Sequence, residues 1–291
     1  PHAYYRNKSL NSRVVGFDPE PEEHLRRVEA AIGTIETSKL EKVVLARAVE
    51  IEFPEAIDPR LVAARLIDLS ANRDGFIADL SPAGRPGAML VGSSPEVLVK
   101  RQGSTVSAFP LAGSSPRRAA AAEDHIAGQD LLHSAKDLHE HSFVVEHLRR
   151  VLSPLCERLD IPDTPQLIST NEMWHLGTPI FGTLKDKDLT ALELALAAHP
   201  TPAICGTPAE AAQALIETAE TDRGFYAGAV GWCDSSGDGE YMVAIRCAEV
   251  AGDGLSARAW AGGGIVGDSD AQAELEETTA KLRTILKALS L

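Results

Sequence analysis

The chain is poor in cysteine and in basic residues, and it has no long apolar run. Its 291 residues include four cysteines without a CxxC pair, so we expect neither a disulfide framework nor a zinc site, and we expect a reducing cytoplasm. No apolar stretch approaches the roughly 20 residues of a membrane-spanning helix, and no signal-peptide pattern opens the chain. The 42 acidic residues outnumber the 28 basic ones, for a net charge of −14. That charge argues against nucleic acid or an anionic membrane as the partner.

The chain contains a mixture of helical and strand periodicities, which favours a single α+β domain over residues 1–291. We expect helices at 21–38, 59–69, 119–152 (with Gly128 as the candidate break), 191–198, 209–217 and 270–289. We expect strands at 42–51, 75–80, 88–92, 97–101 and 105–109, and an antiparallel meander over 227–233, 240–250 and 255–260. Residues 166–184 read as extended and irregular.

Two acidic segments lie far apart in the sequence, both in helical contexts. Glu274, Glu277 and Lys281 fall on one side of the last helix, at i, i+3 and i+7. Glu140 lies between two histidines whose side chains point about 200° apart, which rules out a two-histidine metal face. Each segment alone reads as a polar helix face. Together they offer the few carboxylates that Mg²⁺ takes from a protein.

Four other features have both an ordinary and a functional interpretation. The glycines at 262–264 indicate either a sharp turn or the close approach of a ligand to the backbone. Lys42 begins an apolar strand and Glu96 follows a Ser-Ser-Pro turn, so each could be a surface charge or part of a site. Arg246 lies within an apolar strand, where a buried guanidinium needs a counter-charge or a bound anion.

Eight sequence blocks in this order resemble the chorismate-utilising enzymes, from about residue 22 to the C-terminus. The blocks are KVVLAR (42–47), GSSPE (92–96), FPLAGS (109–114), KDLHEH (136–141), WHLGTP (174–179), HPTPA (199–203), DRGFYAGAVGW (222–232) and AGGGIV (261–266). The resemblance implies an α+β unit of two similar halves, with facing antiparallel sheets and helices packed outside. Family members usually carry a longer portion upstream of the helix that precedes Lys42, so we expect the N-terminal portion to be truncated.

Three positions distinguish the reactions within this family. Ala112 stands where aminodeoxychorismate synthases typically carry a nucleophilic lysine. Lys42 stands where anthranilate synthases usually have none. Ala203 resembles isochorismate synthases, whereas salicylate synthases tend to place a hydroxyl residue there. The resemblance therefore implies an isomerase that converts chorismate to isochorismate.

Other readings of the sequence stay open. A salicylate synthase would go on to eliminate pyruvate, an anthranilate-type enzyme would need a glutaminase partner, and a non-catalytic paralogue would only bind chorismate. The use of the product in menaquinone, siderophore or salicylate synthesis also stays open. We expect a cytoplasmic monomer without a glutaminase subunit.

By resemblance, Lys42 is the general base and Glu96 the general acid. Mg²⁺ is expected on Glu140 and Glu277, with Glu274 close by. The expected substrate contacts are Ala112, Gly113, Ser114, His175, Thr178, Ala203, Gly206, Tyr226, Arg246, Gly262, Gly263, Gly264 and Lys281.

Overall fold

A computed structural model of the protein describes residues 8–291, and its largest sheet has seven strands. The path through this sheet is β1 (Arg13–Asp18), β2 (Lys42–Glu52), β16 (Ser256–Ile265), β15 (Cys247–Val250), β4 (Met89–Gly92) and β3 (Phe76–Asp79), and β12 (Gly206–Thr207) pairs with β2. The long pairing of β2 with β16 runs from Val43 to Glu52 and forms the centre of the sheet.

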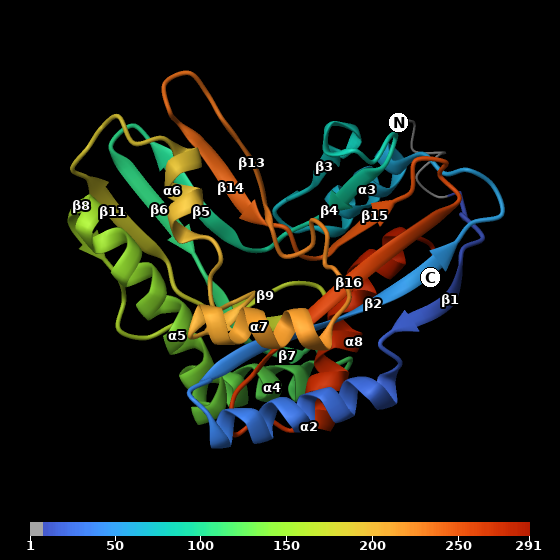
Figure 1. Cartoon of the computed structure of the whole chain (residues 1–291), viewed down its shortest axis with the longest axis horizontal. Helices are drawn as coiled ribbons and strands as arrows, with labels where there is room; N and C mark the ends of the chain where they lie inside the picture. Colours follow the sequence, from blue (N-terminus) through green and yellow to red (C-terminus); the bar gives the residue numbers. More distant parts are fainter. Residues whose placement is uncertain (1–7) are drawn as a thin grey trace.

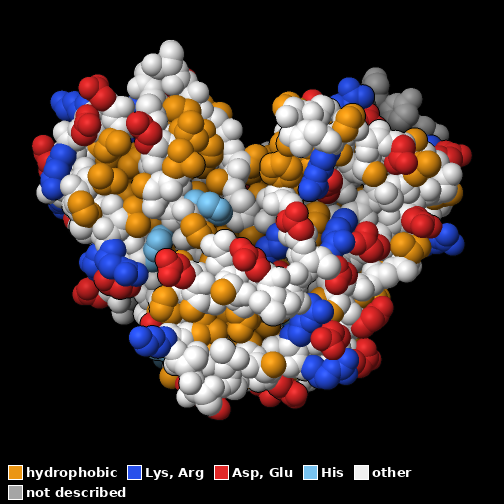
Figure 2. All heavy atoms as spheres, viewed as in Figure 1, with side chains coloured by type: hydrophobic (Ala, Val, Ile, Leu, Met, Phe, Trp, Pro, Cys, Tyr) orange, Lys and Arg blue, Asp and Glu red, His pale blue; other side chains and the backbone are white. Residues whose placement is uncertain are grey.

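A second sheet has six strands and a third has three. The order in the second is β13 (Ala229–Cys233), β14 (Gly239–Val243), β5 (Val97–Gln102), β6 (Thr105–Phe109), β11 (Ile180–Leu184) and β8 (Cys156–Asp160). The third contains β7 (Leu111–Pro116), β10 (Met173–Gly177) and β9 (Gln166–Ser169). In Figure 1 the six-stranded sheet lies on the left and the seven-stranded sheet on the right, and Figure 2 shows a notch between them with hydrophobic side chains on both sides.

Helices cover the outside of the sheets. They are α2 (Pro21–Thr37), α3 (Pro59–Leu69), α4 (Ala121–His133), α5 (Ala135–Leu152), α6 (Ala191–Ala198), α7 (Ala209–Ala219) and α8 (Ala271–Ala288), with 3₁₀ turns at Ser81–Ala83 and Ser153–Leu155. Helix α8 packs on β16, and α2 and α3 pack on α8. The antiparallel pairings and outer helices confirm the expected α+β class. No helix in the part of the chain that the structure describes is long and apolar enough to cross a membrane.

The long helix expected over 119–152 is two helices, and the break is at Ser134 rather than Gly128. The Ser134 side chain accepts a hydrogen bond from the Asp137 N–H and so caps the start of α5. Gly128 stays inside α4, where an added Cβ would lie 3.2 Å from the Trp174 ring. That glycine serves close packing, so its effect on helix propensity did not decide where the helix ends.

The meander expected over 227–260 is confirmed only in part: β13 pairs with β14 and β15 pairs with β16, both antiparallel, but the two pairs belong to different sheets. The 240–250 segment is divided between two sheets, because β14 pairs with β5 whereas β15 pairs with β4 and β16. The chain crosses from one sheet to the other at Arg246, whose φ is 51°. The crossover places Arg246 between the two large sheets. Residues 166–184, expected to be extended and irregular, are extended and contain three regular strands.

Two apolar cores hold these layers together. One includes Leu45, Leu98 and Leu148 and connects the two large sheets with α5. The other includes Ile51, Leu66 and Ile285 and lies under α3 and α8. A fully buried aliphatic side chain stabilises the fold by roughly 1.5–3 kcal/mol relative to exposure. The first core surrounds the charged residues described next, and so keeps water away from them.

Candidate active site

The glycines at 262–264 lie inside β16, opposite Ala46, Leu45 and Val44 of β2, and not in a turn. None of the three has a φ in the left-handed region. A Cβ added at each in chain order would lie 2.7 Å from the Tyr226 hydroxyl, 2.9 Å from Glu274 Oε2 and 2.0 Å from Glu140 Oε1. Glycine is therefore required here because charged and polar side chains approach the backbone from both faces of the sheet.

Lys42 begins β2 and is completely buried. Its Nζ lies 3.3 Å from Glu140 Oε1, within ion-pair distance, and makes no hydrogen bond of good geometry. Burial lowers the pKa of Lys42, an effect that the charge of Glu140 offsets only in part. A lowered pKa makes the neutral amine, the form that can accept a proton, easier to reach than in an exposed lysine.

Glu96 is the second buried ionisable group of this centre, at 3% exposure. It follows the turn after β4, where Ser94 Oγ accepts a hydrogen bond from the Glu96 N–H at 3.2 Å. Burial raises the pKa of Glu96 to about 7, although the Leu111 N–H and the charges of Lys42 and Arg246 act in the opposite direction. The carboxyl group is therefore about half protonated at neutral pH and can donate a proton.

Three buried glutamates surround Lys136. Lys136 Nζ lies 2.8 Å from Glu274 Oε1 and 3.5 Å from Glu140 Oε2. Glu274 Oε2 is buried without a hydrogen-bond partner. Burial raises the pKa of Glu274 to about 8, and the charge of Glu277 adds to this rise. Glu274 therefore carries its negative charge readily only when a further cation balances it.

These carboxylates come from two helices, α5 and α8, which the sequence brought together only through the resemblance. Within residues 8–291, no group of three or more His, Cys, Asp or Glu side chains is already spaced to hold a metal ion. Mg²⁺ needs only one or two protein carboxylates, because water and substrate oxygens fill its other positions. The oxygen donors and the unpartnered Oε2 of Glu274 fit such an ion.

Glu277 connects the carboxylates to the rest of the site. Its Oε1 accepts a hydrogen bond from Ser114 Oγ at 2.7 Å and pairs with Lys281. Lys281 Nζ also donates to the Gly262 carbonyl at 2.9 Å. The amine of Lys281 is thereby held at the β16 side of the site cavity.

Arg246 supplies positive charge that no described ion pair neutralises. It is 9% exposed, and its Nη2 lies 3.4 Å from His175 Nε2. Burial lowers the pKa of His175 well below its usual value, and the charge of Arg246 adds to this. A neutral imidazole does not compensate a guanidinium, so Arg246 is available to a carboxylate ligand.

These groups surround a cavity of about 50 Å³ between the two large sheets. Ligand cavities usually measure roughly 300–1,000 Å³, so side chains must move when a substrate enters. The expected residues that line it are Glu96, Ala112, Gly113, Ser114, Glu140, His175, Ala203, Tyr226, Arg246, Gly262, Gly264 and Lys281. Apolar residues not expected from the sequence also line it, namely Val44, Pro95, Leu111, Ile204, Ile245, Trp260 and Ala261. Most of them lie next to a motif residue in the sequence, and this adjacency is the signal by which they could have been predicted.

The remaining expected residues lie next to the cavity. Lys42 is behind Glu140, and Gly263 faces α8. Glu274 and Glu277 line an adjoining cavity of about 690 Å³, which shares Ser114 with the site cavity and opens toward α4. The carboxylate cluster therefore lies between the site and this second cavity.

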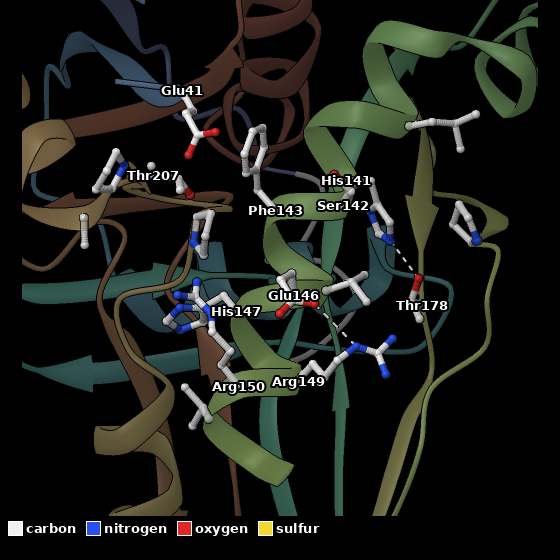
Figure 3. Close-up of a pocket in the computed structure, with 18 of the residues that line it drawn as sticks. Glu41, His141, Ser142, Phe143, Glu146, His147, Arg149, Arg150, Thr178 and Thr207 are labelled. Carbon is white, nitrogen blue, oxygen red and sulfur yellow. Dashed lines mark hydrogen bonds and ion pairs between the residues drawn. The ribbon is translucent and has the colours of Figure 1, made fainter. Parts of the chain in front are cut away.

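Thr178 and Gly206 line a third cavity, of about 1230 Å³, around α5 (Figure 3). His141 points from α5 to Thr178, whose Oγ1 lies 2.7 Å from His141 Nε2. The other ring nitrogen lies 2.9 Å from the Ala112 carbonyl. Glu96, Lys42 and Arg246 do not line this third cavity, so it is separate from the general acid and the general base.

The fold and this site define a chorismate-binding enzyme. The family model described as "Chorismate binding enzyme" matches residues 4–290, and the chain belongs to that family. It is 49% identical over 281 residues to the putative isochorismate synthase MenF of Mycobacterium tuberculosis, covering 95% of this chain and 76% of that protein. It is 45% identical to the isochorismate synthase DhbC of Bacillus subtilis, covering 93% and 68%.

A solved structure has the same fold. The crystal structure of a putative 2,3-dihydroxybenzoate-specific isochorismate synthase, DhbC from Bacillus anthracis, matches with a TM-score of 0.92 and 40% identity. The match covers 98% of this chain and 75% of that one. The similarity extends over all three sheets and hence over every element that carries the site.

Proposed function

We propose that this chain is an isochorismate synthase, an isomerase that interconverts chorismate and isochorismate. The observation that carries the proposal is a buried acid and a buried base, Glu96 and Lys42, beside a cavity that also contains the uncompensated Arg246. The relatives named above bear the same activity in their names.

The reaction removes the hydroxyl group at C4 of the ring and adds one from water at C2. Lys42 takes a proton from a water molecule whose oxygen bonds to C2. The ring double bonds shift, and Glu96 gives its proton to the C4 hydroxyl, which leaves as water. One water enters and one leaves, so the product is an isomer. Lys42 does not itself line the cavity, but its Nζ lies 3.3 Å from Oε1 of Glu140, which does.

The substrate carries two carboxylates into an acidic protein, so local positive charge has to hold it. Arg246 and Lys281, with Tyr226 and the β16 backbone, would bind the pyruvyl carboxylate. Glu140 and Glu277, with Glu274, would hold Mg²⁺, and the ion would neutralise the ring carboxylate when bound. Ala203 brings no hydroxyl to the cavity wall, which favours release of isochorismate over pyruvate elimination.

We further propose a monomer that acts without a glutaminase subunit in the cytoplasm. The cysteine-poor composition without a CxxC pair supports a reducing compartment. Sedimentation at assay concentration tests the oligomeric state.

The test is chromatographic analysis of the protein mixed with chorismate and Mg²⁺, with an EDTA control. The proposal is supported if reactions started from chorismate and from isochorismate reach the same ratio of the two compounds. Formation of salicylate and pyruvate would show that the enzyme also eliminates pyruvate. Glu140→Gln and Glu277→Gln should abolish Mg²⁺-dependent turnover and leave the fold intact. The control is Glu276→Gln, at an exposed position on the same helix as Glu277, and it should keep wild-type turnover. Near-normal turnover in either of the first two would refute the metal assignment.

A further inference from the structure

One side of β2 lacks a strand partner over a short stretch. β12 pairs with β2 at Lys42 and Val43, and the Val44 N–H donates to the Cys205 carbonyl at 2.8 Å. β1 pairs with β2 only from Ala48 onward. Within the described residues, the Val44 carbonyl and the Ala46 N–H on this side therefore meet no strand. Buried backbone groups without partners are costly, so other groups have to satisfy them.

An ion pair between Glu220 and Arg223 fills this gap. Glu220 Oε1 accepts from the Ala46 N–H at 2.7 Å, and Arg223 donates to the Val44 carbonyl at 2.8 Å. Arg223 also donates to the Ile204 carbonyl at 2.8 Å and contacts both oxygens of Glu220, at 2.7 and 2.9 Å. The side chain of Arg223 is only 14% exposed and that of Glu220 only 6%. Every arm of the guanidinium fork is engaged.

Each segment that this pair contacts carries a wall of the site cavity. Val44 lines the cavity from β2, and Ile204 lines it from the loop before β12. The guanidinium carbon of Arg223 lies 5.8 Å from the centre of the Tyr226 ring. Tyr226 lines the cavity as well and stacks on Trp260, with ring centres 5.7 Å apart. Arg223 and Glu220 themselves do not line the cavity.

We propose that Glu220 and Arg223 are positioning residues that fix three walls of the chorismate cavity relative to one another. The inference rests on the proposed function, because it takes chorismate as the molecule between those walls. A planar guanidinium can reach two carbonyls and a carboxylate together, whereas the single nitrogen of a lysine cannot span them.

The test compares Arg223→Lys with Arg26→Lys. Arg26 also contacts a glutamate three residues before it, Glu23, through two nitrogens, but that pair is on the surface. Arg223→Lys keeps the positive charge beside Glu220, so we expect the variant to fold. We expect its KM for chorismate to rise about tenfold and kcat/KM to fall at least as much. Arg26→Lys should match the wild type in both.

The split between kcat and KM separates positioning from a purely structural role. If the pair only stabilised the fold, Arg223→Lys would contain less folded enzyme and a lower apparent kcat, but its folded fraction would keep the wild-type KM. A KM change below threefold would therefore overturn the proposal. Should Arg223→Lys not melt cooperatively, Glu220→Gln decides, since it keeps an oxygen for the Ala46 N–H. Failure of both variants to fold would also overturn it.

Wild-type turnover distinguishes this inference from the proposed function. If the wild type binds chorismate without converting it, the proposed function fails, and the dissociation constant from tryptophan fluorescence replaces KM, since Trp260 lines the cavity. A threefold weaker complex in Arg223→Lys would then still support positioning. If the wild type neither converts nor binds chorismate, both proposals fail.

Discussion

Glu96→Gln should make the protein more stable at alkaline pH and far less active. The folded state holds the pKa of Glu96 at about 7 through burial, against 4.5 for the free side chain. The folded state thus binds the proton more tightly, and the stability it gains is complete below pH 4.5 and lost as the pH rises through 7. At about 1.4 kcal/mol for each pH unit, ionising Glu96 costs the fold about 3 kcal/mol at pH 8. Glutamine is never charged and keeps an oxygen for the Leu111 N–H.

The same pKa predicts the size of the catalytic effect. At pH 7 about half of the Glu96 side chains carry a proton, whereas a carboxyl group with an ordinary pKa would be protonated in about 0.3% of molecules. Burial therefore increases the amount of usable acid by more than a hundredfold. Removing a general acid lowers the rate by roughly 10²–10⁴-fold. We expect a loss of this size in kcat, and we expect the wild-type rate of isochorismate formation to fall above pH 7.

Two assays check this prediction. Thermal melts at pH 5 and pH 8 should show Glu96→Gln about 5–10 °C above the wild type at pH 8 and close to it at pH 5. Initial rates of isochorismate formation by the wild type should fall above pH 7, and the residual rates of Glu96→Gln should not show this fall. Glu29→Gln, exposed on α2, serves as the control. A variant that melts below the wild type at pH 8, or that keeps its kcat, would refute the reasoning.

Three further predictions concern buried groups. Lys42→Met should lose turnover but keep chorismate binding by titration, and loss of binding would make Lys42 an anchor rather than the base. Gly264→Ala should lose at least 10²-fold in kcat/KM, because its Cβ would meet Glu140 Oε1 at 2.0 Å; wild-type kinetics would contradict the described packing. Burial, aided by Arg47, lowers the pKa of His24 from 6.5 to about 4, so its contribution to stability is lost as the pH falls through that range. As the pH falls from 7 to 4, the melting temperature of His24→Leu should therefore rise relative to that of the wild type. A difference that stays constant over this range would contradict the lowered pKa of His24.

The sequence was most informative where a local rule decides the structure. The helix expected over 59–69 is α3, whose start follows from local chemistry: Pro59 suits the first helical position, and the Asp58 side chain accepts a hydrogen bond from the Arg60 N–H. The apolar spacing after Pro21 likewise predicted α2. Such signals lie within a few residues and need no tertiary contact.

Where tertiary contacts decide, local rules failed. Arg246 looked like a residue inside one long strand, but β14 and β15 pair with different neighbours, and only the register of distant strands reveals this. The partner of Glu140 was equally invisible, since no spacing rule relates β2 to α5. The family resemblance placed Arg246 and Glu140 in one site, whereas residue patterns alone left each of them as an isolated charge.

The three glycines of β16 also limit how this cavity can be altered. Because they have no side chains, β16 presents only backbone at the place where carboxylates approach most closely. A side chain introduced at Gly262 or Gly264 would displace Tyr226 or Glu140. Changes in selectivity can instead come from Ala112, Ala203 and Ile245, which line the cavity from other segments and have small or apolar side chains. A directed-evolution library confined to those three positions would sample the tolerant part of the cavity and spare the part that cannot change.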